Sequence, residues 1–271
     1  MYSKIALHSV PRSGSTWVGE IINSSEYVDY SYQPLFSYVF KGLITDKSTR
    51  EDISSFYDGL IGNSDDFVRQ TEQRSAGSLP IFKKFPKPTT VAYKEVRYHY
   101  ILPNLMDADK DVKVIGLIRS PYAVINSWLK APKEFRPDLG WNEMEEWRYA
   151  KRKNLDKQEE YNGYEKWKEV AVMFQTLRAK YPERFYLLKY EDLIKEPLQI
   201  ARELFNFCGL SVTEQTEDFI SQSRNNDMSK DAYSVFRNSN TDDSWTTELS
   251  PDVRAEIETD LTVSGIDYYG Q

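Results

Sequence analysis

The chain has 271 residues, of which 40% are hydrophobic and 28% are charged, and its formal net charge is −7. This composition is typical of a folded globular protein. The negative charge argues against a general nucleic-acid binder, which needs a basic stripe to displace counterions from phosphates. No apolar run approaches the roughly 18 residues of a membrane-spanning helix, and no targeting signal is evident, so we expect no membrane insertion and a cytoplasmic location.

Cysteine and histidine are scarce, with one Cys and two His in the chain. Cys208 lies in an apolar stretch, so we expect it in the core, and a single cysteine allows no intramolecular disulfide. These soft ligands are too few for a dedicated zinc site, and we expect no metal.

Apolar runs alternate along the chain with segments of helical spacing. Buried parallel strands are predicted over residues 4–10, 90–93, 113–118 and 184–188. Helices are predicted over 121–128, 164–180 and 197–208, the last ending at Gly209. The alternation predicts an α/β fold: a single domain over 1–271 with a central parallel sheet flanked by helices on both faces.

The segment after the first strand, residues 11–17, reads PRSGSTW and has the composition of a phosphate cradle. Its small and hydroxylated residues would leave the N–H groups of a helix start open to an anion, and Arg12 adds positive charge. The Walker A pattern of P-loop kinases is absent, because no lysine precedes a Ser or Thr here. The alternative is a structural Ser/Thr cap of a helix after a strand.

Two stretches fit the alternation poorly. Residues 41–88 mix helical pieces with a turn-rich end, and residues 132–162 are dense in charged and aromatic side chains. Ligands of open α/β sheets lie beyond the carboxyl ends of the strands, where such insertions converge. We therefore expect these two stretches to determine substrate specificity.

A second anion-binding signal follows the third predicted strand, in the sequence VIGLIRSP of residues 114–121. Arg119 ends the strand and Pro121 suits the first turn of a helix, which points the arginine into the cleft. Ser127 follows about two helical turns later. A strand-terminal arginine can also be a structural ion-pair partner, but a ligand with two phosphate groups would need two such sites.

Together these segments resemble PAPS-dependent sulfotransferases, where PAPS is 3′-phosphoadenosine 5′-phosphosulfate. Residues 11–17 resemble the family's 5′-phosphosulfate loop, and residues 118–121 with Ser127 resemble its 3′-phosphate segment. Residues 188–193 resemble the Tyr-Glu-Asp-Leu block. Residues 236–238 followed by Trp245 resemble the loop that closes over the nucleotide, although the family's glycine is missing there.

The resemblance implies a sulfotransferase relative of the P-loop-kinase fold, with PAPS as co-substrate and PAP, the 3′,5′-bisphosphate, as product. The 5′ side of the donor would be surrounded by Arg12, Ser13, Gly14, Ser15, Thr16 and Trp17. The 3′-phosphate would be held by Arg119, Ser127, Arg237 and Asn238. Tyr190 would approach the adenine, or else would be a core tyrosine.

Sulfuryl transfer needs positive charge near the leaving group and a base for the acceptor proton. Lys94 is the first candidate for the charge and Arg12 the second. Cytosolic members carry Lys-Thr-His where this chain has Lys94-Glu95-Val96, and carbohydrate-directed members often carry Glu-Pro-Leu where it has Gln33-Pro34-Leu35. Glu95 is the best remaining base, unless it pairs with Arg97 or a surface lysine.

His99 is a weaker candidate for the base, and His8 belongs to the packing of the first strand. The arginine form of the phosphate loop resembles carbohydrate- and lipid-directed members, which favours a glycan or glycolipid acceptor. Several aromatic side chains could stack on sugar faces; they are Tyr30, Tyr32, Phe36, Tyr38, Trp141, Trp147 and Tyr149.

Two other functions remain open from the sequence. One is a non-catalytic protein that binds PAPS or PAP, which the missing histidine and Gln33 make conceivable. The other is a nucleotide-dependent kinase on a related fold, against which the missing Walker lysine counts. The sequence specifies neither the acceptor nor the oligomeric state.

Overall fold

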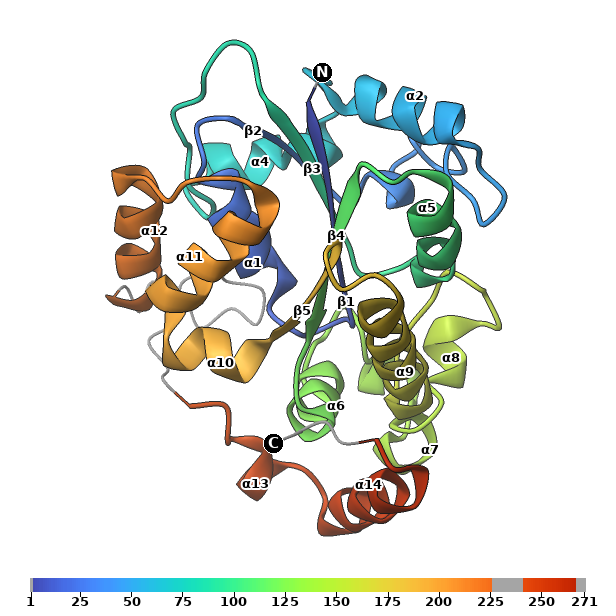
Figure 1. Cartoon of the computed structure of the whole chain (residues 1–271). Helices are drawn as coiled ribbons and strands as arrows, with labels where there is room; N and C mark the ends of the chain where they lie inside the picture. The colour runs from blue at the N-terminus through green and yellow to red at the C-terminus, as the bar shows by residue number, and fades with distance from the viewer. Residues whose placement is uncertain (1, 226–240, 267–271) are drawn as a thin grey trace.

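The protein is described by a computed structural model that covers residues 2–225 and 241–266. Its centre is a five-stranded sheet in the order β2-β3-β1-β4-β5, in which each neighbouring pair is parallel (Figure 1). The strands are β1 (Ser3–Ser9), β2 (Val28–Tyr32), β3 (Thr90–Glu95), β4 (Val112–Ile118) and β5 (Phe185–Lys189). The predicted fold class, a parallel sheet flanked by helices, is confirmed.

The helices of the described residues surround this sheet. They are α1 (Ser15–Asn23), α2 (Arg50–Leu60), α3 (Asp66–Arg69), α4 (Thr71–Ser75), α5 (Leu102–Ala108), α6 (Pro121–Leu129), α7 (Glu143–Glu146), α8 (Lys151–Asn154), α9 (Tyr164–Lys180), α10 (Tyr190–Lys195), α11 (Pro197–Cys208), α12 (Glu214–Asn225), α13 (Trp245–Glu248) and α14 (Pro251–Ser264). Short 3₁₀ turns span Pro34–Phe36, His99–Ile101 and Pro137–Leu139.

Alternate residues of the central strands enter two separate apolar layers. Ile5 and Leu7 of β1 pack with residues of α1, α10, α11 and α12 on one face. Ala6 and Val10 pack with residues of α2, α5, α9 and α14 on the other face. Both faces of the sheet are therefore covered, as expected for parallel strands that read as continuous apolar runs.

The predicted bounds match the structure most closely for two of the longer helices. α9 and α11 have the predicted bounds, and Gly209 follows α11 with a φ of 76° in the left-handed region. Cys208 is buried in α11, as predicted, and burial raises the pKa of its thiol to about 12. Within the described ranges, no helix is long and apolar enough to cross a bilayer.

β2 was not predicted, because its sequence VDYSY contains no apolar run. It is an edge strand that pairs only with β3, and the ring of Tyr30 packs beneath Gly19 of α1. A Cβ at Gly19 would lie 2.1 Å from the Tyr30 hydroxyl. The expectation that Tyr30 could stack on a sugar is therefore wrong, and Trp147 is likewise a buried core residue.

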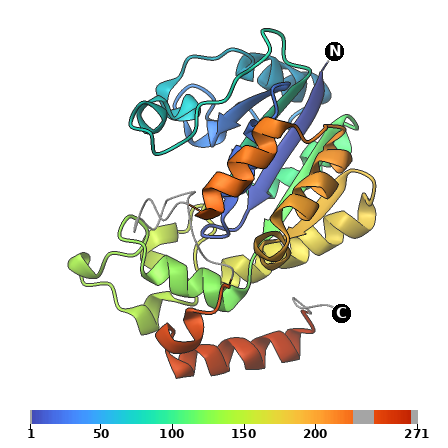
Figure 2. The same ribbon diagram turned by 90° about the vertical axis from the view of Figure 1, so that its left-hand side faces the viewer.

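Part of the stretch 41–88, which was expected to determine substrate specificity, lies at the amino end of the sheet. α2 lies beside the N-terminus in Figure 1, and Ser54 of α2 accepts a hydrogen bond from Lys4 Nζ at the amino end of β1. This part of 41–88 contributes to the core, away from the carboxyl ends of the strands. Figure 2 shows that α14 lies at the opposite end of the molecule from the N-terminus.

Candidate functional site

The loop between β1 and α1 has an unusual backbone. Arg12 and Gly14 have φ values of 69° and 82°, both in the left-handed region that few non-glycine residues adopt. Gly14 directly precedes α1 and provides no side-chain cap, so the N–H groups of the first helical turn are available to bind an anion. The buried Ser13 hydroxyl has no hydrogen-bond partner among the described residues. These features fit a phosphate or sulfonate group in the loop.

The loop between β4 and α6 joins the first loop directly. Arg119 Nη1 donates a 2.6 Å hydrogen bond to the carbonyl oxygen of Arg12, and Arg12 Nε donates to Ser127 Oγ at 3.2 Å. Trp167 Nε1 donates to the carbonyl oxygen of Arg119 at 2.9 Å, which holds the end of β4 against α9. The two predicted anion-binding segments therefore lie side by side, with their arginines turned toward the same junction.

Tyr190 is the first residue of α10 and packs against both loops. A Cβ at Gly14 would lie only 2.5 Å from Tyr190 Cε2, so glycine is required there for this approach. The Arg119 guanidinium lies 4.9 Å from the centre of the Tyr190 ring, within cation–π range. Trp17 contacts the same ring edge-on and donates from Nε1 to Ser223 Oγ at 2.9 Å.

Asp242, which the sequence did not indicate, forms an ion pair with Arg119. Arg119 Nε donates to Asp242 Oδ2 at 2.6 Å, and Arg119 Nη2 donates to Asp242 Oδ1. The two residues are 123 positions apart, and no motif links them. Arg237 and Asn238, predicted to hold the 3′-phosphate, lie outside the described residues.

Lys94 and Glu95 end β3 and are both almost completely buried. Burial lowers the pKa of Lys94 to about 7, and its Nζ lies 4.2 Å from the centre of the Tyr32 ring. Burial also raises the pKa of Glu95 to about 8. Glu95 Oε1 accepts a 2.8 Å hydrogen bond from the backbone N–H of Leu35, while Oε2 is buried without a partner in the described part of the chain. Such perturbed groups are typical of reactive sites.

Gln33 lies beside Lys94 and is fixed by both its backbone and its side chain. Its N–H donates to the carbonyl oxygen of Lys94 at 2.8 Å, and its Oε1 accepts from Arg97 Nη1 at 3.2 Å. Arg97, the alternative partner expected for Glu95, instead donates from Nε to Glu160 Oε1 at 3.0 Å. Through this pair, the end of the 132–162 stretch reaches the carboxyl edge of the sheet. The sequence did not predict the Arg97–Glu160 pair itself.

His8 and His99 form a buried pair behind these residues. Their Nδ1 atoms are 3.0 Å apart, and His8 Nε2 lies 3.2 Å from the Tyr93 hydroxyl. Burial lowers the pKa of His99 to about 3. His8 belongs to the packing of β1, as predicted. His99 is as fully buried as Glu95, and its Nε2 has no hydrogen-bond partner among the described residues.

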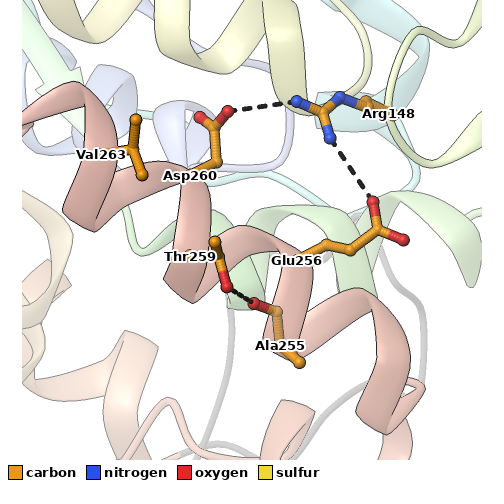
Figure 3. Close-up of a pocket in the computed structure, with 6 residues that line it drawn as sticks. All are labelled: Arg148, Ala255, Glu256, Thr259, Asp260 and Val263. Atoms are coloured by element: carbon orange, nitrogen blue, oxygen red, sulfur yellow. Dashed lines mark hydrogen bonds and ion pairs between the residues drawn. The ribbon is translucent and has the colours of Figure 1, made fainter.

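A hollow beside α14 has no lining residue from these loops (Figure 3). It is lined by Arg148, Ala255, Glu256, Thr259, Asp260 and Val263. Arg148 pairs with Glu256 at 3.4 Å and with Asp260 at 3.1 Å, so its charge is neutralised within the wall. These contacts hold α14 against the segment between α7 and α8. Within 2–225 and 241–266, no group of three His, Cys, Asp or Glu could hold a metal ion.

Comparison with known proteins places the chain in a family. The family model described as "Sulfotransferase domain" matches residues 3–261. Mouse carbohydrate sulfotransferase 3 is 30% identical over 164 residues, which cover 55% of this chain and 32% of that protein. Zebrafish carbohydrate sulfotransferase 1 is 23% identical over 312 residues, which cover 92% and 73%. The chain thus spans about a third of the length of the mouse relative.

Solved structures share the fold. A mouse sulfotransferase crystallised with PAP superposes with a TM-score of 0.57 at 16% identity, covering 98% of this chain and 85% of that one. A sulfotransferase from Alicyclobacillus acidocaldarius gives a TM-score of 0.54 at 14% identity, covering 97% and 92%. At these identities the likeness establishes the arrangement of the sheet and its helices.

Proposed function

The chain belongs to the sulfotransferase family, and we propose that it transfers a sulfuryl group from PAPS to an acceptor hydroxyl or amine. The junction of the β1–α1 and β4–α6 loops carries this proposal. A donor with phosphate groups on both its 5′ and 3′ sides needs two anion sites close together, and Arg12 and Arg119 are joined by a hydrogen bond. The helix start, the buried Ser13 hydroxyl and Gly14 suit the 5′ side.

The remaining nucleotide contacts follow from the same geometry. Arg119 and Ser127 would bind the 3′-phosphate, and Arg12 would lie between the two phosphates because its Nε already reaches Ser127. Ser15, Thr16 and Trp17 would complete the 5′ side at the start of α1. Tyr190 would form the wall shared by both sites, a role compatible with its contacts to Gly14 and Arg119.

Lys94 and Glu95 are the residues to which we assign the chemistry. The acceptor oxygen or nitrogen would attack sulfur, its proton would pass to Glu95 Oε2, and the bond from sulfur to the 5′-phosphate oxygen would break. Lys94, when protonated, would stabilise the negative charge that develops on the departing oxygen. Glu95 Oε1 is held by Leu35 of the Gln33-Pro34-Leu35 segment, so the carboxylate lies beside the position where carbohydrate-directed members often carry glutamate.

The acceptor class rests on the relatives. Those reported above are named carbohydrate sulfotransferases, which supports a glycan or glycolipid acceptor for this chain. The half-exposed Phe36 ring, stacked against the Arg97 guanidinium at 4.2 Å, offers a surface beside Glu95 on which a sugar face could rest. A cytoplasmic location stays a prediction, which cell fractionation tests.

Labelled PAPS supplied with a panel of sugars, glycolipids, phenols and amines tests the activity, with PAP affinity measured by calorimetry. Arg119→Ala removes charge-assisted hydrogen bonds and should weaken PAP binding at least about tenfold. Arg50→Ala, an exposed arginine paired with Asp111, is the matched control and should leave PAP affinity unchanged. Equal affinity of wild type and Arg119→Ala would overturn the nucleotide assignment.

Gln33 supports a second candidate function, which is binding of PAP without catalysis. An amide cannot accept a proton usefully at the position where carbohydrate-directed members often carry a carboxylate. Saturable PAP binding without transfer to any acceptor in the panel would favour this alternative. Transfer that depends on Glu95 would exclude it.

A further inference from the structure

The ion pair between Arg119 and Asp242 occupies the position where the proposed function needs an anion from the nucleotide. Arg119 has five N–H donors. Two of them engage the Asp242 carboxylate in a bidentate pair, and a third engages the carbonyl oxygen of Arg12. This is the pairing that arginine also makes with phosphate, because both anions present two oxygens to the planar guanidinium.

The surroundings of the pair leave little room for two anions. The side chains of Arg119 and Asp242 are only 8% and 11% exposed. A phosphate bound to the same guanidinium would lie close to the Asp242 carboxylate, and two like charges repel strongly where solvent is largely excluded. The carboxylate and a 3′-phosphate therefore compete for one arginine.

The segment that carries Asp242 is held over α6 by contacts of its own. Trp245 stacks on Tyr122, with ring centres 4.6 Å apart and planes 18° apart. Glu248 accepts from Asn126 Nδ2 at 2.8 Å and pairs with Lys130 Nζ at 2.7 Å. These contacts position the carboxylate against Arg119 without any ligand.

We propose that Asp242 is an internal competitor of the 3′-phosphate and that nucleotide binding displaces it from Arg119. The inference rests on the proposed function, since it requires Arg119 to bind that phosphate. Asp242 then sets nucleotide affinity. If the carboxylate occupies Arg119 in about nine of ten molecules, it weakens the apparent affinity about tenfold. Release of PAP after transfer is favoured for the same reason, because Asp242 takes the arginine back.

The test is calorimetric titration of wild type, Asp242→Asn and Asp243→Asn with PAP and with 5′-AMP, which lacks the 3′-phosphate. Asp242→Asn should bind PAP about tenfold more tightly than wild type and should bind 5′-AMP with unchanged affinity. Asp243→Asn removes the same charge at the exposed neighbouring residue and should change neither affinity. Asp242→Ser removes the same carboxylate and serves as a second variant if Asp242→Asn folds poorly. Thermal unfolding curves of all variants identify any folding defect.

Weaker PAP binding by both Asp242 variants would overturn the proposal and identify Asp242 as a positioning residue for Arg119. Unchanged PAP binding would also overturn it, because the ion pair would then have no effect on nucleotide affinity. Equal tightening for PAP and 5′-AMP would overturn it as well, because the effect would then be one of general charge. The proposed function fails separately, if wild type does not bind PAP or if Arg119→Ala binds it as well as wild type.

Discussion

Charged side chains have different surroundings in the two halves of the sheet's carboxyl edge. In the half formed by the loops after β1 and β4, the arginines are matched by oxygen atoms: Arg119 by Asp242 and a backbone carbonyl, and Arg12 by Ser127. In the half formed by the end of β3, Lys94 and Glu95 are buried, with pKa values shifted to about 7 and about 8.

Under the proposed function, this difference corresponds to a division between nucleotide recognition and chemistry. Matched charges hold a fixed geometry, which suits binding of a rigid, highly charged nucleotide. Buried groups that titrate near neutral pH can gain or lose a proton during a reaction, at a cost in stability. The contrast therefore predicts that substitutions in the first half act on nucleotide affinity and that substitutions in the second half act on turnover.

Glu95→Gln should give the largest effect, a loss of about 10²- to 10⁴-fold in kcat. The amide can still accept the hydrogen bond from Leu35 but cannot take a proton, so PAP affinity should stay within about twofold. Steady-state rates and calorimetry measure the two quantities. Glu160→Gln, which weakens the ion pair to Arg97 nearby, is the matched control.

A second readout of Glu95→Gln tests its burial. Because the pKa of Glu95 is raised from 4.5 to about 8, ionisation opposes folding, and stability is lost as pH rises through that window. The variant should therefore unfold at a higher temperature than wild type at about pH 8, and by less at about pH 5. Unchanged kcat would contradict the base role, even if the temperature shift appears.

Lys94→Arg should change the pH profile of kcat/KM. Wild-type activity should rise as Glu95 deprotonates toward a pKa of about 8 and fall as Lys94 loses its proton above a pKa of about 7, which gives a maximum between these values. Arginine stays protonated, so the alkaline fall, up to about tenfold per pH unit, should disappear. Lys113→Arg is the control, and an unchanged profile of Lys94→Arg would refute the role of Lys94.

Of the three variants, Gly14→Ala should have the smallest effect on function, and it should change nucleotide affinity without changing turnover. An added Cβ would lie 2.5 Å from Tyr190 at a backbone φ of 82°. We expect a loss of about 1 to 3 kcal/mol in the free energy of unfolding and about tenfold weaker PAP binding, with kcat at saturating PAPS little changed.

Gly140→Ala is the matched control for Gly14→Ala, because Gly140 has a φ of 73° and open space around its Cβ position. It should show the cost of the left-handed backbone without the contact to Tyr190. A loss of kcat in Gly14→Ala as large as that in Glu95→Gln would contradict the proposed division, in which one half acts on nucleotide affinity and the other on turnover.

The position of the two loops in the proposed nucleotide half was largely predictable from the sequence. Glycine and hydroxyl residues after an apolar run, and an arginine at the end of another, carry local signals that hold in any α/β sheet. The bounds of α9 and α11 were equally clear, because long apolar periodicity leaves little choice of register.

The missed features depend on contacts between distant segments. β2 lacks an apolar run, and the burial of Tyr30 follows only from the packing of Gly19 against it. The pairs Arg97–Glu160 and Arg119–Asp242 join residues 63 and 123 positions apart. No local pattern selects a partner among the 42 acidic residues of the chain.

The buried state of Cys208 has a practical consequence. Since the chain has one cysteine and burial raises the pKa of its thiol to about 12, little of it is thiolate at neutral pH and reagents reach it slowly. A second cysteine engineered at an exposed site, such as Thr246 on α13, could therefore take a fluorescent label selectively in the native protein. Such a dye would follow the segment around Asp242 in real time during nucleotide exchange.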